Sequence, residues 1–329
     1  MSHSNISIFV PHLGCPHQCS FCNQKHITGQ CTQPSKQDVD NAVKIAMASS
    51  GYSANTCEIA FFGGSFTAID RAYMMELLAA AYNYVEKGFV RGIRISTRPD
   101  CIDQPILDTL KKYGVTAIEL GAQSMCDDVL IANERGHSVE DINTASLLIK
   151  NNGFELGLQM MTGLYCSNDE KDIITAERII ALTPDTVRIY PTIVLENTAL
   201  AEIYRAGSYS VPTLDNAVML CAKLREMFEK AAIRVIRLGL HTIDEKSYVA
   251  GPWHPAFSEL CDTLKYRQLI AHKILKTGKY EILVNSSEVS KAIGHKRSNI
   301  TYFANKKIFL KIKPDNGVSK YDLIIKEVK

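Results

Sequence analysis

Short apolar runs alternate with amphipathic stretches over most of the 329-residue chain. The runs have the length of strands, whereas the stretches between them repeat apolar positions every three to four residues, as helices do. Strands are predicted at residues 6–10, 57–62, 92–96, 117–120, 155–161, 186–190 and 234–238. Helices are predicted at residues 38–49, 71–87, 104–112, 138–151, 170–182 and 214–230.

This alternation is typical of βα repeats around a parallel sheet, so the predicted fold class is α/β. Seven such units can curl into a full or partial (β/α) barrel. In such folds the active site gathers at the carboxyl ends of the strands.

The βα rhythm ends near residues 240–265, where Gly251-Pro252-Trp253-His254-Pro255 supplies turn formers. We therefore predict a main domain at residues 1–250 and a small α+β region at residues 251–329. Trp253, His254 and His241 are expected to pack this appendage onto the barrel.

Charge separates the two parts of the chain, although the net charge is only +2. Residues 263–329 hold 15 Lys or Arg against 5 Asp or Glu, whereas residues 1–262 hold 22 against 30. A basic region on an acidic body predicts an anionic partner, with nucleic acid the first candidate. A solvated, lysine-rich surface would give the same composition.

Within the basic region, residues 286–300 read as a helix, a glycine turn at Gly294 and a second helix, with Ser287 a candidate cap. The pattern suits a helix-turn-helix, whose second helix could meet nucleic acid, but two short packed helices would look the same. The alternation at residues 307–313 predicts a strand.

Candidate chemistry begins with Cys15, Cys19 and Cys22, which follow the first predicted strand in C-x3-C-x2-C spacing. Three thiolates this close can hold three corners of a 4Fe–4S cluster and leave one iron open for chemistry. The alternative is a structural zinc site, which normally closes with four ligands. The candidates for its fourth ligand are His12, His17, His26 and Cys31.

The chain has ten cysteines, and those outside the motif occur singly along the sequence. This spacing does not indicate a disulfide framework. No apolar run approaches the length of a membrane span, and the first residues lack the pattern of a signal peptide. The expected location is therefore a reducing cytoplasm.

Small or polar residues follow the predicted strands at residues 63–66, 96–100 and 121–124, and a further polar segment at residues 133–137 follows a short predicted helix. Paired glycines let backbone approach a ligand closely, although they also serve ordinary turns. Several polar tips around one barrel mouth predict a bound polar ligand. Arg98 and Asp100 are expected to form a structural ion pair, and Tyr165 and Tyr190 to shape the pocket.

The cysteine motif, with Phe21 before its last cysteine, is similar to that of radical S-adenosylmethionine (SAM) enzymes. Five further segments look like the radical domain of the Elongator catalytic subunit, and the coproporphyrinogen-dehydrogenase-like group shares a looser version of them. The resemblance covers roughly residues 5–245. The segments are residues 63–67, 96–100, 119–124, 133–137 and 189–192.

The resemblance implies a partial (β/α) barrel of the radical SAM type, with a 4Fe–4S cluster on Cys15, Cys19 and Cys22. S-adenosylmethionine would chelate the open iron. An electron from an external donor would then cleave it, giving a 5′-deoxyadenosyl radical that abstracts hydrogen from a substrate.

The resemblance also assigns the cofactor-binding residues. Gly63, Gly64 and Ser65 would meet the methionine amino group, and backbone beside Phe21 would meet adenine. The remaining assignments are Val194 as an apolar neighbour, and Gln123 and Arg135 near the ribose and carboxylate.

The chain departs from its relatives in three places. Ser96 stands where they commonly carry Glu, and Gln159 lies in a segment that is more acidic or ends in proline elsewhere. Nothing after residue 245 looks like the Elongator acetyltransferase domain. The leading hypothesis is a radical SAM enzyme acting on RNA such as tRNA, with the basic region as its contact.

Two other hypotheses remain open. One is a radical SAM oxidase or transferase that acts on a small molecule. The other is a non-catalytic nucleic-acid-binding protein that carries a cluster or zinc.

Overall fold

Seven parallel strands form one curled sheet in the computed structural model, which describes residues 4–11, 19–22, 33–240 and 243–328. The strand order is β1-β2-β3-β4-β5-β6-β8, so successive βα units add neighbouring strands. The strands are β1 (Ser4–Val10), β2 (Cys57–Gly63), β3 (Gly92–Thr97), β4 (Val115–Gln123), β5 (Glu155–Thr162), β6 (Thr186–Pro191) and β8 (Arg234–Leu238). This confirms all seven predicted strands and the predicted α/β partial barrel.

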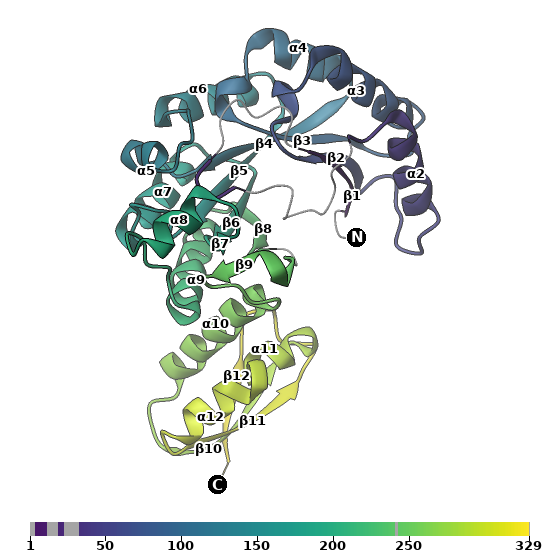
Figure 1. Cartoon of the computed structure of the whole chain (residues 1–329). Helices are drawn as coiled ribbons and strands as arrows, with labels where there is room; N and C mark the ends of the chain where they lie inside the picture. Colours follow the sequence, from purple (N-terminus) through teal and green to yellow (C-terminus); the bar gives the residue numbers. More distant parts are fainter. Residues whose placement is uncertain (1–3, 12–18, 23–32, 241–242, 329) are drawn as a thin grey trace.

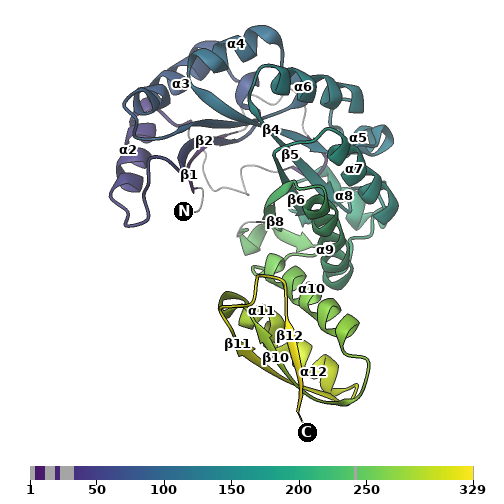
Figure 2. The same ribbon diagram turned by 180° about the vertical axis from the view of Figure 1, so that it is seen from behind.

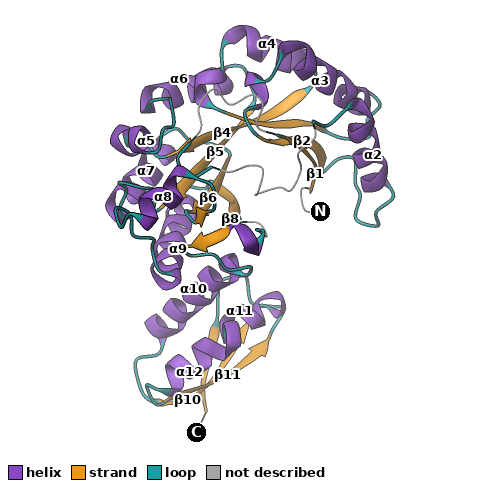
Figure 3. Ribbon diagram, in the orientation of Figure 1, coloured by secondary structure: helices purple, strands orange, loops and turns teal. Residues whose placement is uncertain are grey.

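Helices cover the convex side of the sheet, which curls as a half-barrel (Figure 1, Figure 3). Serine N-caps with capping boxes start two of these helices, at Ser35 and Ser138. These helices are α2 (Lys36–Met47), α3 (Arg71–Glu86), α4 (Gln104–Lys112), α5 (Asp127–Ala132), α6 (Val139–Asn151), α7 (Asp169–Ala181) and α9 (Leu214–Lys230). Helix α8 (Ala199–Arg205) instead contributes Leu200 to a separate apolar cluster with Val194.

The two faces of the sheet carry different side chains because successive strand residues point to opposite sides. Ile59, Ile93 and Leu156 face the helices and belong to the main hydrophobic cluster. Their neighbours Glu58 and Arg94 belong to the concave side, which is therefore rich in charge.

The C-terminal unit consists of a second, three-stranded sheet with helices on one face (Figure 2). Strand β10 lies in the centre, parallel to β11 and antiparallel to β12. The elements are α10 (Phe257–Lys273), β10 (Gly278–Val284), α11 (Val289–Ile293), α12 (Ser298–Ala304), β11 (Ile308–Pro314) and β12 (Ile324–Val328). The strand predicted at residues 307–313 is confirmed.

Helix α10 joins the two parts of the molecule. Its first half contributes Phe257 and Cys261 to the main cluster, and its second half contributes Tyr266 and Ile270 to the core of the C-terminal unit. The sequence indicated turns in this region and missed the helix. The domain boundary after residue 250 stays a prediction, because α10 belongs to both cores.

The helix–turn–helix pattern takes the form of two short helices on either side of Gly294. The expected cap at Ser287 is wrong. Asn285 caps this segment instead, because its side chain accepts a hydrogen bond from the Ser287 N–H. No helix among the described residues is long and apolar enough to span a membrane.

A short antiparallel pair, β7 (Val194–Leu195) and β9 (Tyr248–Ala250), lies next to the half-barrel. Trp253 packs against Tyr248 at its edge. The His254 ring meets the His295 ring at 5.1 Å, which connects the barrel side to the C-terminal unit as expected. His241 lies outside the described residues.

Candidate functional site

Residues 19–22 form a turn that the rest of the fold holds in place. The Cys22 N–H donates to the Cys19 carbonyl at 3.0 Å. The Ser20 hydroxyl donates to Asn133 Oδ1 at 3.0 Å, and the Leu200 N–H donates to the Ser20 carbonyl at 2.8 Å. The turn is thus anchored both after α5 and at the start of α8. Cys15 lies outside the described residues.

Arg135 connects this turn to the end of β4. Its Nη1 donates to Cys19 Sγ at 2.9 Å, and its Nη2 donates to the Gly121 carbonyl at 2.7 Å. The guanidinium also lies 6.0 Å from the centre of the Phe21 ring. A buried guanidinium therefore contacts the sulfur of a predicted cluster ligand.

Arg98 holds the backbone of Arg135. Its guanidinium pairs with Asp100 through bonds of 2.9 and 3.1 Å, and Nη2 also donates to the Arg135 carbonyl. The predicted Arg98–Asp100 ion pair is confirmed. Besides closing the loop, Arg98 holds the backbone of Arg135, the residue that contacts Cys19.

His137 is buried beside these two guanidinium groups, and sequence reasoning gave it no role of its own. Burial, followed by the charges of Arg135 and Arg98, lowers the pKa of His137 to about 4. The ring is therefore neutral at pH 7. Neither ring nitrogen has a hydrogen-bond partner among the described residues. The sequence signal for it was its place in the polar segment at residues 133–137.

The glycine turn after β2 brings backbone against β1. Gly63 has φ +122°, and a Cβ there would lie 2.3 Å from the Val10 carbonyl oxygen. The Gly64 N–H donates to that same carbonyl at 3.0 Å. Only glycine fits this position, and the turn opens at the carboxyl edge of the sheet, as predicted.

Ser65 uses its hydroxyl within the protein. The oxygen lies 2.8 Å from Thr97 Oγ1 and accepts the Arg98 N–H at 3.3 Å. The side chain is 1% exposed. In the described structure it connects the loops after β2 and β3, a role that the sequence did not indicate.

Gln123 and Val194 lie near the cysteine turn at residues 19–22. Gln123 has φ +67° after a register shift in β4, and its Oε1 accepts Gln159 Nε2 at 3.4 Å. A Cβ on Gly121 would come within 3.4 Å of both the Gln123 and the Arg135 side chains. Val194 is fully buried in a small apolar cluster against which Phe21 packs. The predicted residues thus converge from separate elements.

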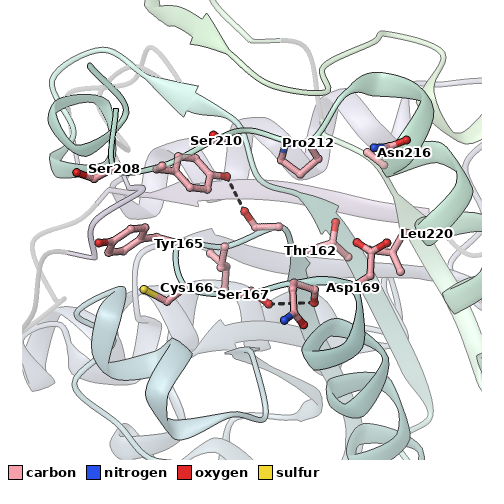
Figure 4. A pocket seen from close by; sticks show the side chains of 15 residues that line it. Thr162, Tyr165, Cys166, Ser167, Asp169, Ser208, Ser210, Pro212, Asn216 and Leu220 are labelled. Atoms are coloured by element: carbon pink, nitrogen blue, oxygen red, sulfur yellow. Dashed lines mark hydrogen bonds between the residues drawn. The ribbon is translucent and has the colours of Figure 1, made fainter. Parts of the chain in front are cut away.

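A cavity of about 370 Å³ lies beside the carboxyl end of β5, between the first turns of α7 and α9 (Figure 4). Tyr165 lines this cavity and Tyr190 does not, and the prediction that both shape the substrate pocket stays a prediction. Tyr209 donates to the Gly163 carbonyl at 2.5 Å and meets Tyr165 edge to face. Both tyrosines also belong to the cluster that contains Val194, so the cavity and the cysteine turn share an apolar wall.

The donor set of this region fits an iron–sulfur cluster. Soft thiolates are its usual ligands, and the buried Arg135 guanidinium lies beside one of them, Cys19. The described residues alone do not bring three metal-ligating side chains together. Cys15 and the four residues considered for a zinc site lie outside that part of the chain.

Comparison with known proteins identifies related sequences. The Radical SAM superfamily profile matches residues 9–179, and the Radical_SAM C-terminal domain profile matches residues 184–266. A tRNA uridine(34) acetyltransferase of Dehalococcoides mccartyi is 26% identical over 238 residues, 62% of this chain and 52% of that protein. Elongator complex protein 3 of Mus musculus is 31% identical over 198 residues, 53% of this chain and 36% of that protein.

The fold has solved counterparts. Elp3 of Methanocaldococcus infernus, with an N-terminal deletion, superimposes with a TM-score of 0.67 at 20% identity, covering 85% of this chain and 66% of that one. Coproporphyrinogen III oxidase (HemN) of Escherichia coli gives a TM-score of 0.50 at 17% identity, covering 70% and 53%. The chain spans about half or less of the length of the curated relatives it matches.

Proposed function

The chain belongs to the radical SAM superfamily, and from this premise we propose that Cys15, Cys19 and Cys22 hold a 4Fe–4S cluster that binds S-adenosylmethionine. The contact from Arg135 to Cys19 Sγ carries this proposal, because it places a buried cation on a predicted ligand. The glycine turn at Gly63 and Gly64 supports it, because the turn lies at the carboxyl end of β2, where the active site of such a fold gathers.

The chain's own residues would prepare the site for this chemistry. Arg135 would offset negative charge on the sulfur, and the turn at Gly63 and Gly64 would meet the cofactor's amino group. The apolar cluster of Val194 and Phe21 excludes water from one side. When bound, the cluster and S-adenosylmethionine supply a 5′-deoxyadenosyl radical that abstracts hydrogen from a substrate, with the electron coming from an external donor.

RNA such as tRNA is the substrate class that we propose. Support comes from the relatives, several of which are named for tRNA or Elongator, and from the basic C-terminal region. Acetyl transfer is not carried over, because the matched segment covers about a third of the Elongator proteins. RNA modification of this kind would place the protein in the cytoplasm.

A small-molecule substrate is the second candidate, and the cavity of about 370 Å³ favours it. Its volume falls in the range of small-ligand pockets, and hydroxyl and amide groups line it. This reading keeps the radical chemistry and changes only what it acts on.

The test begins with anaerobic reconstitution with iron and sulfide. Addition of dithionite and S-adenosylmethionine should then yield 5′-deoxyadenosine. Cys19→Ala should lose the bound iron and this product while the chain stays folded. Cys126→Ala, which alters a half-buried cysteine at the start of α5, is the matched control and should retain both.

Two results would contradict the proposal. An intact cluster in Cys19→Ala would overturn the ligand assignment. Zinc without iron in the reconstituted protein would favour the non-catalytic, nucleic-acid-binding alternative.

A further inference from the structure

One face of the C-terminal sheet is not covered by any described helix. On β10 the buried residues Tyr280, Ile282 and Val284 face the helices, so Lys279 and Glu281 point to the other side. The strand register places Phe309 and Lys311 of β11 beside these two residues, with Lys326 of β12 beside Glu281. We call this surface the open sheet face.

The open sheet face carries a positive charge that the protein does not neutralise. Lys279, Lys311 and Lys326 are exposed, and among the described residues no ion pair involves them. Glu281 is the acidic group on this face, and it is bound to Lys313 at 2.5 Å. That hydrogen bond, with the charges of Lys326 and Lys311, lowers the pKa of Glu281. Four lysines and one ionised glutamate leave a net charge of +3.

Several cations on the helix side are paired instead. Lys265 pairs with Glu229 at 2.6 Å, and Lys291 pairs with Asp262 at 3.1 Å. The three exposed lysines of the sheet differ from these two, because no acidic partner offsets their charge among the described residues.

An aromatic ring lies among these lysines. The Phe309 side chain is 56% exposed and stands in the row of Lys279 and Val328. Val328 and Ile324 are each 47% exposed at the neighbouring edge. A flat sheet that offers an aromatic face between cations suits unpaired nucleobases, which stack on the ring while lysines meet the phosphates.

We propose that the open sheet face binds single-stranded RNA, with a base stacked on Phe309 and phosphates beside Lys279, Lys311 and Lys326. The inference rests on the proposed function for its choice of RNA. A second copy of the chain packed face to face would bring like charges together, which charge repulsion disfavours. An RNA duplex keeps its bases stacked inside and would leave the ring unused.

The structure favours this surface over the turn between α11 and α12. Helix α11 has five residues and α12 has seven, and Asn299 and Phe303 of α12 are buried. Lys296 and Arg297 are exposed in the turn and offer charge, but the exposed ring beside them, His295, already contacts the His254 ring at 5.1 Å.

The first experiment measures affinity by fluorescence anisotropy, with the full reconstituted chain and a labelled single-stranded RNA of about twelve nucleotides. Phe309→Ala should weaken binding by about fivefold or more, and Phe309→Tyr should restore it, because the tyrosine ring also stacks. The same RNA annealed to its complement should bind more weakly than the single strand. Unchanged affinity in Phe309→Ala, or preference for the duplex, would overturn the inference.

The second experiment removes charge in two matched ways. Lys311→Gln with Lys326→Gln should weaken binding and reduce the slope of log affinity against log salt by about 1.4. Lys296→Gln with Arg297→Gln removes the same charge from the turn and should leave affinity near that of the wild type. The reverse result would assign RNA to the turn between the short helices and reject the open sheet face.

Two further readouts separate this inference from its alternatives. Formation of 5′-deoxyadenosine without RNA should be equal in all these variants. If the wild type forms no 5′-deoxyadenosine but Phe309→Ala still weakens RNA binding, the proposed function is wrong and the inference about the open sheet face holds. A dimer that Phe309→Ala dissociates, with RNA affinity unchanged, would show the face to be a contact between copies.

Discussion

Gly63 is a position in the turn after β2 where a Cβ atom cannot be accommodated. Its φ of +122° disfavours other residues, and an added Cβ would meet the Val10 carbonyl oxygen of the neighbouring strand. The sequence marked this glycine as part of a turn. The reason that no side chain fits is β1, which lies more than fifty residues earlier in the chain.

We expect Gly63→Ala to lower the free energy of unfolding by at least about 2 kcal/mol, because strain and close contact add. Urea unfolding measures the difference. Gly51→Ala is the control, since a Cβ there would meet no atom within 4 Å, and it should change stability by less than about 0.5 kcal/mol. Equal stability of the two variants would show that β1 moves aside.

Asp172 is a buried carboxyl group beside the cavity. Burial raises its pKa to about 6 from 3.8, against hydrogen bonds from Ser167 and the Gly163 N–H that lower it. The unfolded chain therefore releases this proton at a lower pH than the folded chain does. The contribution to stability is fully present below about pH 4 and is lost as the pH rises through about 6.

The predicted consequence is a difference in pH dependence. Between pH 4 and pH 7 the wild type should lose up to about 3 kcal/mol that Asp172→Asn does not lose, because the amide cannot ionise. Denaturant unfolding at a series of pH values gives both curves. Parallel curves would mean that Asp172 titrates at its ordinary pKa in the folded protein.

The strands of the barrel are held together on their concave side by a charged network. Arg94 of β3 pairs with Glu58 of β2 at 2.9 Å and with Glu155 of β5 at 2.8 Å. It is 2% exposed and also lies 3.4 Å from Glu119 of β4, which binds Arg188 of β6. The network therefore spans five strands. It lies on the face of the sheet that the alternation of polar and apolar residues alone would expose to water or to a ligand.

Arg94→Leu should lower the free energy of unfolding by about 3 kcal/mol or more, because it leaves buried carboxylates without their partner. Arg205→Leu removes an exposed ion pair with Glu196 and should cost less than about 1 kcal/mol. Thermal and denaturant unfolding compare the two. A loss of equal size in both would show that the buried network adds nothing beyond surface charge.

Helix α10 shows why the sequence missed an element. Its buried residues point to two different cores, Phe257 and Cys261 to one and Tyr266 and Ile270 to the other. A helix that serves two cores has no single apolar stripe. The turn formers before it, at residues 251–255, favoured the interpretation of this region as a linker.

At the scale of the whole molecule, one carboxylate connects the barrel to the C-terminal unit. Asp262 of α10 accepts Arg225 Nη1 of α9 at 2.6 Å and the Tyr321 hydroxyl at 3.0 Å. Lys291 lies 3.1 Å from its other oxygen. The side chain is nearly buried, so these partners depend on it.

Asp262→Ala should destabilise the chain by about 3 kcal/mol and loosen the C-terminal unit, since Arg225 loses its buried partner. Hydrogen exchange should then accelerate at β10 and β12 more than at the barrel strands. Glu226→Ala, which removes an exposed pair one residue along α9, is the control and should leave exchange unchanged. Uniform acceleration would mean that the two parts unfold as one.

The sequence by itself predicted the seven strands of the barrel and most of the helices between them, and it supplied the ligands that we propose for the cluster. Periodicity is local, so these elements could be predicted from neighbouring residues, as could the cysteine spacing and the glycines of the turn, whereas the short helix α8 was missed. The resemblance to radical SAM enzymes rested on the same local segments.

Tertiary structure alone decided which side chains meet. Arg135 contacts Cys19 across more than a hundred residues, and a shift in the register of β4 sets the position of Gln123. The tertiary structure also directs the hydroxyl of Ser65 toward Thr97 and leaves Phe309 on the open sheet face. These outcomes depend on how distant strands pair and which face the helices cover, which no local pattern specifies.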